Sequence, residues 1–221
     1  MIKNRSSRQG FTMMELLVVM TIISILTSLC VLGFKSLTGS IGLTGASDQF
    51  TSFLAFARQR AIARNTMVAT VILTSGTYDK AAYRTYSAWE LALPSDGTAP
   101  SSSNWVQTSP WKTLPPGVVV DSTATASGFL NSPTVSPALP TLDYMGKSLN
   151  PKTECAVQLF LPSGRLNPPP TDPCNLRLVE GFYAGSTLTY QHPSPANSAL
   201  PANYVSYIFS TATGEPKIVR P

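Results

Sequence analysis

Proline is missing from the first 93 residues of this 221-residue chain, although 19 prolines follow from Pro94 onward. A stretch without proline can form one long helix and then strands, whereas the proline-rich remainder must be broken into short strands and loops. The length suits one domain with a further segment attached. The sequence therefore predicts two structural regimes and contains no internal repeat.

Residues that bind metals or catalyse proton transfer are scarce. His192 is the only histidine, and the three cysteines include no close pair, so a zinc site lacks ligands. A hydrolase triad would have to use His192, and the chain contains no G-x-S-x-G, HExxH or phosphate-binding loop motif. We therefore expect no enzyme, no metal and no cofactor.

Charge is also scarce, at 12% of residues against 43% hydrophobic residues. This balance suggests that part of the chain lies outside water. Lys3, Arg5 and Arg8 belong to the first ten residues, so the rest of the chain carries 13 of the 16 basic side chains and 11 acidic ones. A nearly neutral body is not expected to bind polyanions by charge alone.

A run of 19 residues without charge extends from Leu16 to Phe34. As a helix it spans ~28 Å, which matches the apolar core of a bilayer. Because the basic residues precede it, the N-terminus is expected in the cytoplasm and the chain after about residue 40 on the other side of the membrane.

Three interpretations compete for this apolar run: a retained membrane helix, a cleaved secretory signal and a lipoprotein signal. A lipoprotein signal needs a small residue before its cysteine, but Leu29 precedes Cys30. A secretory signal has a shorter apolar stretch followed by a small-residue cleavage site, for which Thr44-Gly45-Ala46 is a poor candidate. The residues favour the retained helix.

Glu15 is an acid at the edge of the apolar run, where burying a carboxylate is expensive unless it finds a partner. One interpretation is that it marks where the membrane ends, with its carboxylate among the headgroups. The other is a functional charge. Position alone does not decide between them.

The segment GFTMMELLVVMTIISIL resembles the N-terminal signal of type IV prepilins: a short basic leader ending in Gly10, then Phe11, and Glu15 as the fifth residue counted from Phe11. The resemblance implies cleavage between Gly10 and Phe11 by a prepilin peptidase, followed by N-methylation of Phe11. The chain departs from many major pilins at Leu32, where they carry proline, which favours a minor subunit.

The resemblance also implies a role for Glu15 in assembly. The new ammonium group of Phe11 and the Glu15 carboxylate of a neighbouring subunit can neutralise each other as the helix enters a filament. The implied partners are other pilin or pseudopilin subunits, the prepilin peptidase and the inner membrane.

Beyond the apolar run, a second helical pattern is predicted over residues 47–65, with Ser47 or Asp48 as its cap and a weak joint at Gly39, Gly42 and Gly45. Its apolar stripe suits packing beneath a sheet of the same chain, or less favourably docking on a partner helix. Its basic side chains either stay hydrated near the helix C-terminus or bind phosphates; these are Arg58, Arg60 and Arg64.

Residues 66–221 are predicted to be rich in β-strands. The most secure prediction is a hairpin formed by 66–74 and 82–93. Further short strands are expected around 105–108, 117–121, 155–161, 176–180, 186–191 and 204–211, with a terminal strand after the turn at 213–215.

The segments FARQRAIARNTMVATVIL, FLPSGRL and YIFSTATGEPKIV together resemble the GspH/FimT group of pseudopilins, with the Verru_Chthon cassette protein D type as a divergent alternative. The resemblance implies an α+β fold, a long N-terminal helix followed by a β-rich pilin-like domain. It also suggests a second function, the capture of DNA for uptake, with contacts from Arg58, Arg60, Arg64, Lys217 and Arg220. The near-neutral body argues against that alternative.

Cys155 and Cys174 lie in the predicted extracytoplasmic body and could form a disulfide in an oxidising compartment. Closing the loop between them would add about 3 kcal/mol to the stability of the fold. The alternative is two free buried thiols.

These predictions divide the chain into a leader (1–10), a pilin helix (11–65, with its transmembrane part at 11–35) and a periplasmic or extracellular β-rich domain (66–221). The predicted function is that of a minor pseudopilin, single-pass in the inner membrane until it enters a type II secretion or type IV pilus-like filament. An anchored or secreted enzyme remains a remote third possibility.

Overall fold

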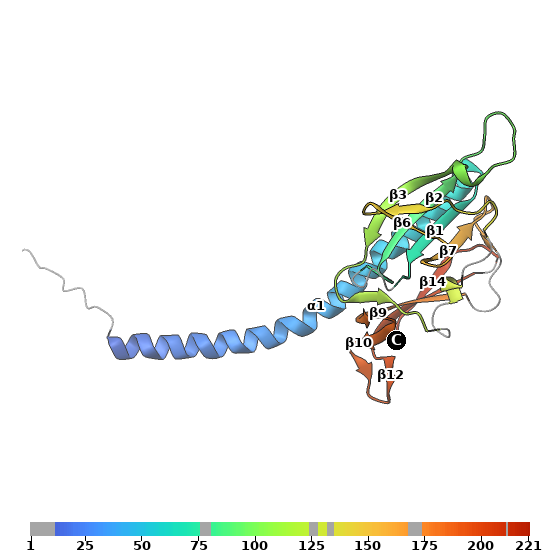
Figure 1. Cartoon of the computed structure of the whole chain (residues 1–221). Helices are drawn as coiled ribbons and strands as arrows, with labels where there is room; N and C mark the ends of the chain where they lie inside the picture. The colour runs from blue at the N-terminus through green and yellow to red at the C-terminus, as the bar shows by residue number, and fades with distance from the viewer. Residues whose placement is uncertain (1–11, 76–80, 124–127, 132–134, 168–173, 211) are drawn as a thin grey trace, which may run out of the picture. The chain divides into compact units, whose positions relative to one another are not determined.

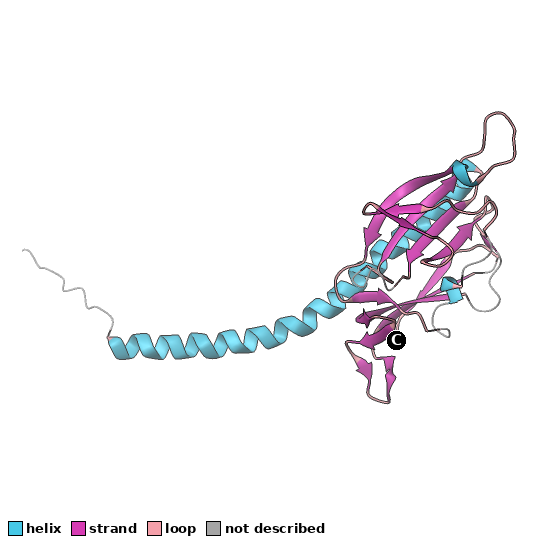
Figure 2. Cartoon of the chain, viewed as in Figure 1, coloured by secondary structure: helices cyan, strands magenta, loops and turns pink. Residues whose placement is uncertain are grey.

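The computed structural model describes residues 12–75, 81–123, 128–131, 135–167, 174–210 and 212–221, and within α1 it leaves out the side chains of residues 29–41. The chain divides into two compact units, 1–40 and 41–221, which are treated separately below. The predicted fold class, α+β with a long N-terminal helix followed by a β-rich domain, is confirmed (Figures 1 and 2).

Helix α1 runs from Met13 to Arg64. Ser47 and Asp48 therefore lie inside it, and the prediction that one of them caps a separate helix is wrong. The helix continues through Gly42 and Gly45, although each glycine costs about 1 kcal/mol relative to alanine. The buried side chains of Leu43 and Ala46 offset that cost by packing into the core.

The 41–221 unit contains the second half of α1 together with the sheets. The predicted boundary at 65/66 is therefore a boundary of secondary structure, because the compact unit already begins at Ile41. Phe50, Phe53 and Leu54 form the centre of the core, where the ring of Phe50 packs edge-on against Tyr86 and Tyr207. The predicted packing of this helix under its own sheets is confirmed.

The first sheet has the strand order β3-β2-β1-β7-β8 and is antiparallel throughout. The predicted hairpin of β1 and β2 is confirmed by five backbone pairs from Val68↔Glu90 to Ile72↔Tyr86. The strands are β1 (Val68–Leu73), β2 (Thr85–Leu91), β3 (Trp105–Thr113), β7 (Cys155–Phe160) and β8 (Leu166–Asn167).

Both faces of this sheet are covered, which explains why all six residues of β1 are buried. Val68 and Ile72 face the core around α1, whereas Val71 and Leu73 face a second cluster. That second cluster is completed by the hairpin of β5 (Leu142–Tyr144) and β6 (Lys147–Leu149).

The β5–β6 hairpin was not predicted. Its two-residue turn, Met145-Gly146, has positive φ at both positions (52° and 76°), which is the geometry that joins tight antiparallel strands. Methionine is an unusual residue for such a turn, and this is why the sequence pattern did not reveal it.

The second sheet has the order β10-β9-β13-β14, and β4 pairs with β9 on its other side along residues 178–180. Its strands are β4 (Val118–Val120), β9 (Asn175–Ala184), β10 (Thr187–Tyr190), β13 (Tyr204–Phe209) and β14 (Pro216–Val219). All five were predicted. A further hairpin, β11 (Pro193–Ser194) with β12 (Asn197–Pro201), was not, because prolines disfavour strands.

Two edge strands carry residues that disfavour further pairing. β3 contains Pro110 and Lys112, with irregular register against β2, and β14 contains Pro216 and Lys217. Proline lacks the backbone N–H that a new strand would need, and a lysine on an edge would be buried by pairing.

Candidate functional site at the start of helix α1

Thr12 caps the N-terminus of α1. Its hydroxyl oxygen accepts the Glu15 backbone N–H at 3.2 Å, and its carbonyl accepts the Leu16 N–H at 3.2 Å. The first N–H groups of a helix have no partner within the helix, and a threonine at this position satisfies one of them. The T-x-x-E spacing of Thr12 and Glu15 is that of a capping box, a signal that our sequence analysis did not use.

Glu15 therefore lies in the first turn of the helix and is exposed. A negative side chain in this turn is favoured by the positive end of the helix dipole, typically by about 0.3–1 kcal/mol at an exposed position. The cap fixes where the helix begins, and this places Glu15 in the first turn. Gly10 and Phe11, the predicted cleavage site, lie outside the described residues.

The first turns of helix α1 expose apolar side chains around their circumference. Eleven large ones are exposed between residues 13 and 26, namely Met13, Met14, Leu16, Leu17, Val18, Val19, Met20, Ile22, Ile23, Ile25 and Leu26. A helix that is apolar all round requires apolar surroundings such as a bilayer or neighbouring helices. In a search limited to the described residues, no helix was both long and apolar enough to count as a membrane span.

The hydroxyl groups in this stretch are satisfied within the helix. Thr21 donates to the Val18 carbonyl at 2.7 Å and Ser24 donates to the Met20 carbonyl at 2.8 Å. Thr27 and Ser28 make the same kind of bond to carbonyls three or four residues earlier. Four polar side chains can therefore enter an apolar medium without leaving an unpaired donor.

A family profile described as the prokaryotic N-terminal methylation motif matches residues 5–31. The chain carries this methylation motif. The predicted resemblance to prepilins is confirmed by the match, which includes Gly10, Phe11, Thr12 and Glu15.

Solved structures similar to the chain include the following three. Two are of the minor pseudopilin EpsH from the type 2 secretion system of Vibrio cholerae, each with 13% identity and a TM-score of 0.42; they cover 81% and 83% of this chain and 97% and 96% of their own. The type IV minor pilin FimU of Pseudomonas aeruginosa has 12% identity and a TM-score of 0.39, covering 83% of this chain and 91% of its own. A comparison with curated proteins found no match.

The basic residues proposed to contact DNA differ in their surroundings in this methylation-motif chain. Arg58 donates through Nε to the Thr213 carbonyl at 2.9 Å, and Arg60 forms an ion pair with Glu90. Arg64 lies exposed in the last turn of α1, whereas Lys217 and Arg220 are exposed at and beyond β14. Two of the five are thus used in contacts within the body.

The predicted disulfide is not formed. Cys155 and Cys174 are both free thiols. Successive residues of a strand face opposite sides of its sheet. Cys155 faces the second cluster together with Val157, whereas Cys174 lies in the core around α1. The alternative of two free buried thiols is the one observed. Burial raises the pKa of both thiols to about 12, and the Glu154 carboxylate adds to the effect at Cys155.

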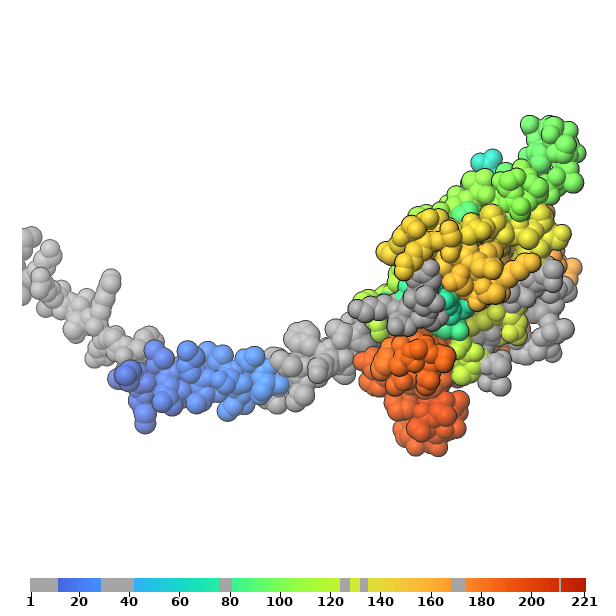
Figure 3. All heavy atoms as spheres, viewed as in Figure 1, coloured from blue at the N-terminus to red at the C-terminus, as the bar shows by residue number. Residues whose placement is uncertain are grey.

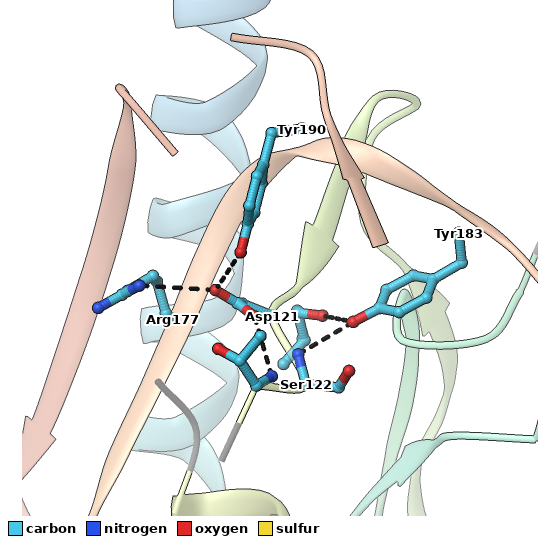
Figure 4. A network of polar contacts seen from close by, with 7 residues as sticks. Asp121, Ser122, Arg177, Tyr183 and Tyr190 are labelled. Atoms are coloured by element: carbon cyan, nitrogen blue, oxygen red, sulfur yellow. Dashed lines mark hydrogen bonds and ion pairs between the residues drawn. The ribbon is translucent and has the colours of Figure 1, made fainter. Parts of the chain in front are cut away.

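A buried carboxylate, Asp121, joins several strands of the second sheet (Figure 4). Its side chain is fully buried, accepts the Thr123 N–H at 3.0 Å and the Tyr190 hydroxyl at 3.2 Å, and lies 3.6 Å from an Arg177 guanidinium nitrogen. The Tyr183 hydroxyl donates to the Val120 carbonyl at 2.9 Å nearby. Arg177 and Tyr190 are far from Asp121 in sequence, so no local pattern could have revealed these two contacts.

A second buried carboxylate, Glu180 on β9, holds both ends of the β11–β12 hairpin. It accepts the Asn203 side-chain amide at 3.1 Å and lies 3.4 Å from Nε2 of His192. The burial of both carboxylates is accounted for by their contacts with other side chains and backbone groups of the chain. Within the described residues, no group of three or more His, Cys, Asp or Glu is arranged to hold a metal ion.

Proposed function

We propose that the chain is a minor pilin-like or pseudopilin subunit. A prepilin peptidase cuts it between Gly10 and Phe11, and the mature helix then joins a type II secretion or type IV pilus-like filament. Before assembly the helix is a single-pass anchor in the inner membrane, with the body on the periplasmic side. The observation that carries this proposal is the methylation motif at 5–31.

The geometry of the helix start supports the proposal. With cleavage after Gly10, Phe11 becomes the first residue, Thr12 the cap and Glu15 a member of the first turn. The new ammonium group would then lie close to the positive end of the helix dipole, where a positive charge is unfavourable. A Glu15 carboxylate supplied by a neighbouring subunit would offset this unfavourable interaction of the ammonium group with the helix dipole.

The surface of the helix supports it as well. Eleven large apolar side chains within residues 13–26 are exposed and require an apolar environment, and the four hydroxyls within residues 21–28 already bond to carbonyls of their own helix. A bilayer supplies that environment before assembly, and the helices of other subunits supply it afterwards.

Intact mass and N-terminal fragmentation of the protein from native membranes test the proposal. We expect a chain that begins with N-methylated Phe11. Replacing Gly10 by valine should leave the uncut precursor, whereas a matched change upstream, Gln9→Ala, should be processed normally. Cleavage of the Gly10→Val chain, or a terminus beyond residue 40, would overturn the proposal.

Assembly is tested separately with Glu15→Gln. We expect the variant to be cut and methylated like the native chain but recovered in filaments at a much reduced yield, because the carboxylate charge is lost while the side-chain shape is kept. Incorporation at the native yield would show that Glu15 has no role in assembly.

A further inference from the structure

We infer that strand β10 pairs edge to edge with β10 of a second copy of the chain. The two strands run antiparallel, and Thr189 lies opposite Thr189 of the second copy. The pairing concerns the 41–221 unit alone. It goes beyond the proposed function, because it does not depend on whether the N-terminus is cut and methylated.

The first observation is how β9 and β10 leave the second sheet. β13 pairs with β9 along residues 175–179 and β4 pairs with it along 178–180, so from Gly181 onward β10 is the only strand partner of β9 among the described residues. Residues 181–190 therefore form a two-stranded ribbon that continues beyond the sheet. In Figure 3 the orange part of the chain, which includes this ribbon, lies at the surface of the body. Two strands by themselves are at best marginally stable in water, and further strands stabilise them.

The second observation is that the β10 edge lacks the residues that protect the other edges. Among the described edge strands of more than three residues, β3, β12 and β14 each contain proline, and β3 and β14 also contain lysine. β10 has the sequence Thr-Leu-Thr-Tyr, and no Asp, Glu, Lys or Arg occurs from Gly181 to Gly214. A second copy can therefore approach this edge without like-charge repulsion.

The third observation is the direction of the backbone groups of β10. The Gln191 N–H bonds to the Glu180 carbonyl at 2.9 Å, which makes these two residues a hydrogen-bonded pair. Because such pairs alternate along an antiparallel ladder, Thr189 also bonds towards β9, whereas Leu188 and Tyr190 direct their N–H and C=O groups to the outer edge. Within the described residues, β9 is the only strand that pairs with β10.

The sequence of β10 is complementary to itself in this arrangement. With a two-fold axis at Thr189, Leu188 lies opposite Tyr190 of the second copy, so that outward backbone groups meet and about four hydrogen bonds can form. Leu188 and Tyr190 lie on one face of the ribbon with Tyr183, and an aliphatic residue opposite an aromatic one is a favourable cross-strand pair. On the other face, the two Thr189 side chains meet between the Phe182 residues of both copies. Phe182 is the β9 partner of Thr189 and is 57% exposed.

The body holds the ribbon in one orientation. The Tyr190 hydroxyl donates to the buried carboxylate of Asp121 at 3.2 Å, and the ring of Tyr183 stacks on Tyr83 with 4.3 Å between the ring centroids. The β10 edge is therefore ordered before a second strand arrives, which lowers the entropy lost on pairing.

Cysteine cross-linking of the full chain in dodecylmaltoside micelles tests the pairing and its register. Cys30 is replaced by alanine throughout, and Thr189→Cys is compared with Thr187→Cys, since both threonines are exposed on β10. Opposite residues of a non-hydrogen-bonded pair have Cα atoms about 4.5 Å apart, so Thr189→Cys should give a disulfide-linked dimer on mild oxidation. The two copies of residue 187 would lie about 13 Å apart along the strands, so Thr187→Cys should give at least about tenfold less dimer.

Charge exchange is a second test, which needs no cysteine. Thr189→Lys and Thr189→Glu each place like charges opposite each other, so either variant alone should lower the dimer-to-monomer ratio at least about fivefold. Light scattering coupled to size-exclusion chromatography measures this ratio. An equimolar mixture of the two variants should restore it, because opposite charges then face each other. Ser148→Lys, an exposed position on β6, is the matched control and should leave the ratio unchanged.

Three results would overturn the inference: a native chain that stays monomeric at every concentration, equal cross-linking at residues 187 and 189, or an unchanged dimer ratio in both charge variants. Restoration by the mixture, together with cross-linking at 189 and not at 187, would support it. The mass of the N-terminal fragment tests the proposed function without reference to dimers, so the two can fail separately.

Discussion

The hydroxyl of Tyr207 on β13 donates a hydrogen bond to the backbone carbonyl of Ser47, 2.9 Å away in the middle of α1. Both residues are fully buried, and the Ser47 hydroxyl lies 3.1 Å from the same tyrosine oxygen. This bond joins the helix to the second sheet, and burial raises the pKa of the Tyr207 hydroxyl.

Removing that hydroxyl should weaken the body. For Tyr207→Phe we expect a loss of about 1–2 kcal/mol in the free energy of unfolding, because a buried acceptor loses its donor. Denaturant titration followed by circular dichroism measures it. Ser47→Ala is the matched control and should cost less, since the backbone acceptor remains. Equal losses in the two variants would contradict this account.

Asp121 should matter more for stability than any single partner of it. In Asp121→Asn the charge facing Arg177 is lost and an amide hydrogen can point at the Tyr190 hydroxyl, so we expect a loss of about 3 kcal/mol. Tyr190→Phe removes one partly buried bond and should cost about 1 kcal/mol. A loss below that of Tyr190→Phe would argue against the network.

Alkaline conditions should destabilise the body. The pKa of Cys155 and of Cys174 is raised to about 12 by burial, and the pKa of Tyr86 is raised to about 12 mainly by burial. The folded chain therefore holds protons that the unfolded chain releases, so stability is complete below the unfolded thiol value of about 8.5 and falls as pH rises towards 12. Unfolding midpoints measured between pH 7 and 11 check this.

The thiols provide a control for that experiment. A Cys155→Ala, Cys174→Ala double variant should show a smaller fall in stability between pH 8.5 and 11 than the native chain. In a folded chain whose Cys30 is replaced by alanine, both Cys155 and Cys174 should react slowly with a thiol reagent at pH 8, and rapidly once denaturant is added. Rapid reaction without denaturant would show that they are not buried.

Binding of DNA by the body should be weak. Arg58 and Arg60 are used within the body, which leaves Arg64, Lys217 and Arg220 exposed among the candidates. Three phosphate contacts give a slope of log K against log salt no steeper than about −3. Lys217→Ala with Arg220→Ala should flatten the slope by about 2, which a fluorescence titration at several salt concentrations would detect. A steep slope that survives this change would point to other residues.

The strands were predictable where hydrophobic and β-branched residues dominate, as in β1 and β13, because both patterns are local. The cap at Ser47 was wrongly predicted for the opposite reason: a distant strand, through Tyr207, buries that serine within a continuous helix. The prediction of a disulfide was wrong because Cys155 and Cys174 face different clusters. Their separation along the chain does not indicate which side of a sheet each cysteine faces.

The start of α1 was the most predictable part of the site, since Thr12 and Glu15 are joined by a bond that spans three residues. Asp121 and Glu180 were not predictable, because their partners come from strands that are neighbours only after folding. Local motifs thus predict the start of α1, whereas long-range pairing determines the polar contacts of the body.

Pro110 and Lys112 on β3, together with Pro216 and Lys217 on β14, have a consequence for a crowded assembly. Copies of a subunit in a filament stand side by side at a local concentration far above that in solution, where an unprotected sheet edge would add strands from its neighbour. If the chain assembles as proposed, adjacent bodies could touch without pairing along β3 or β14, so that contacts at these two edges would stay reversible.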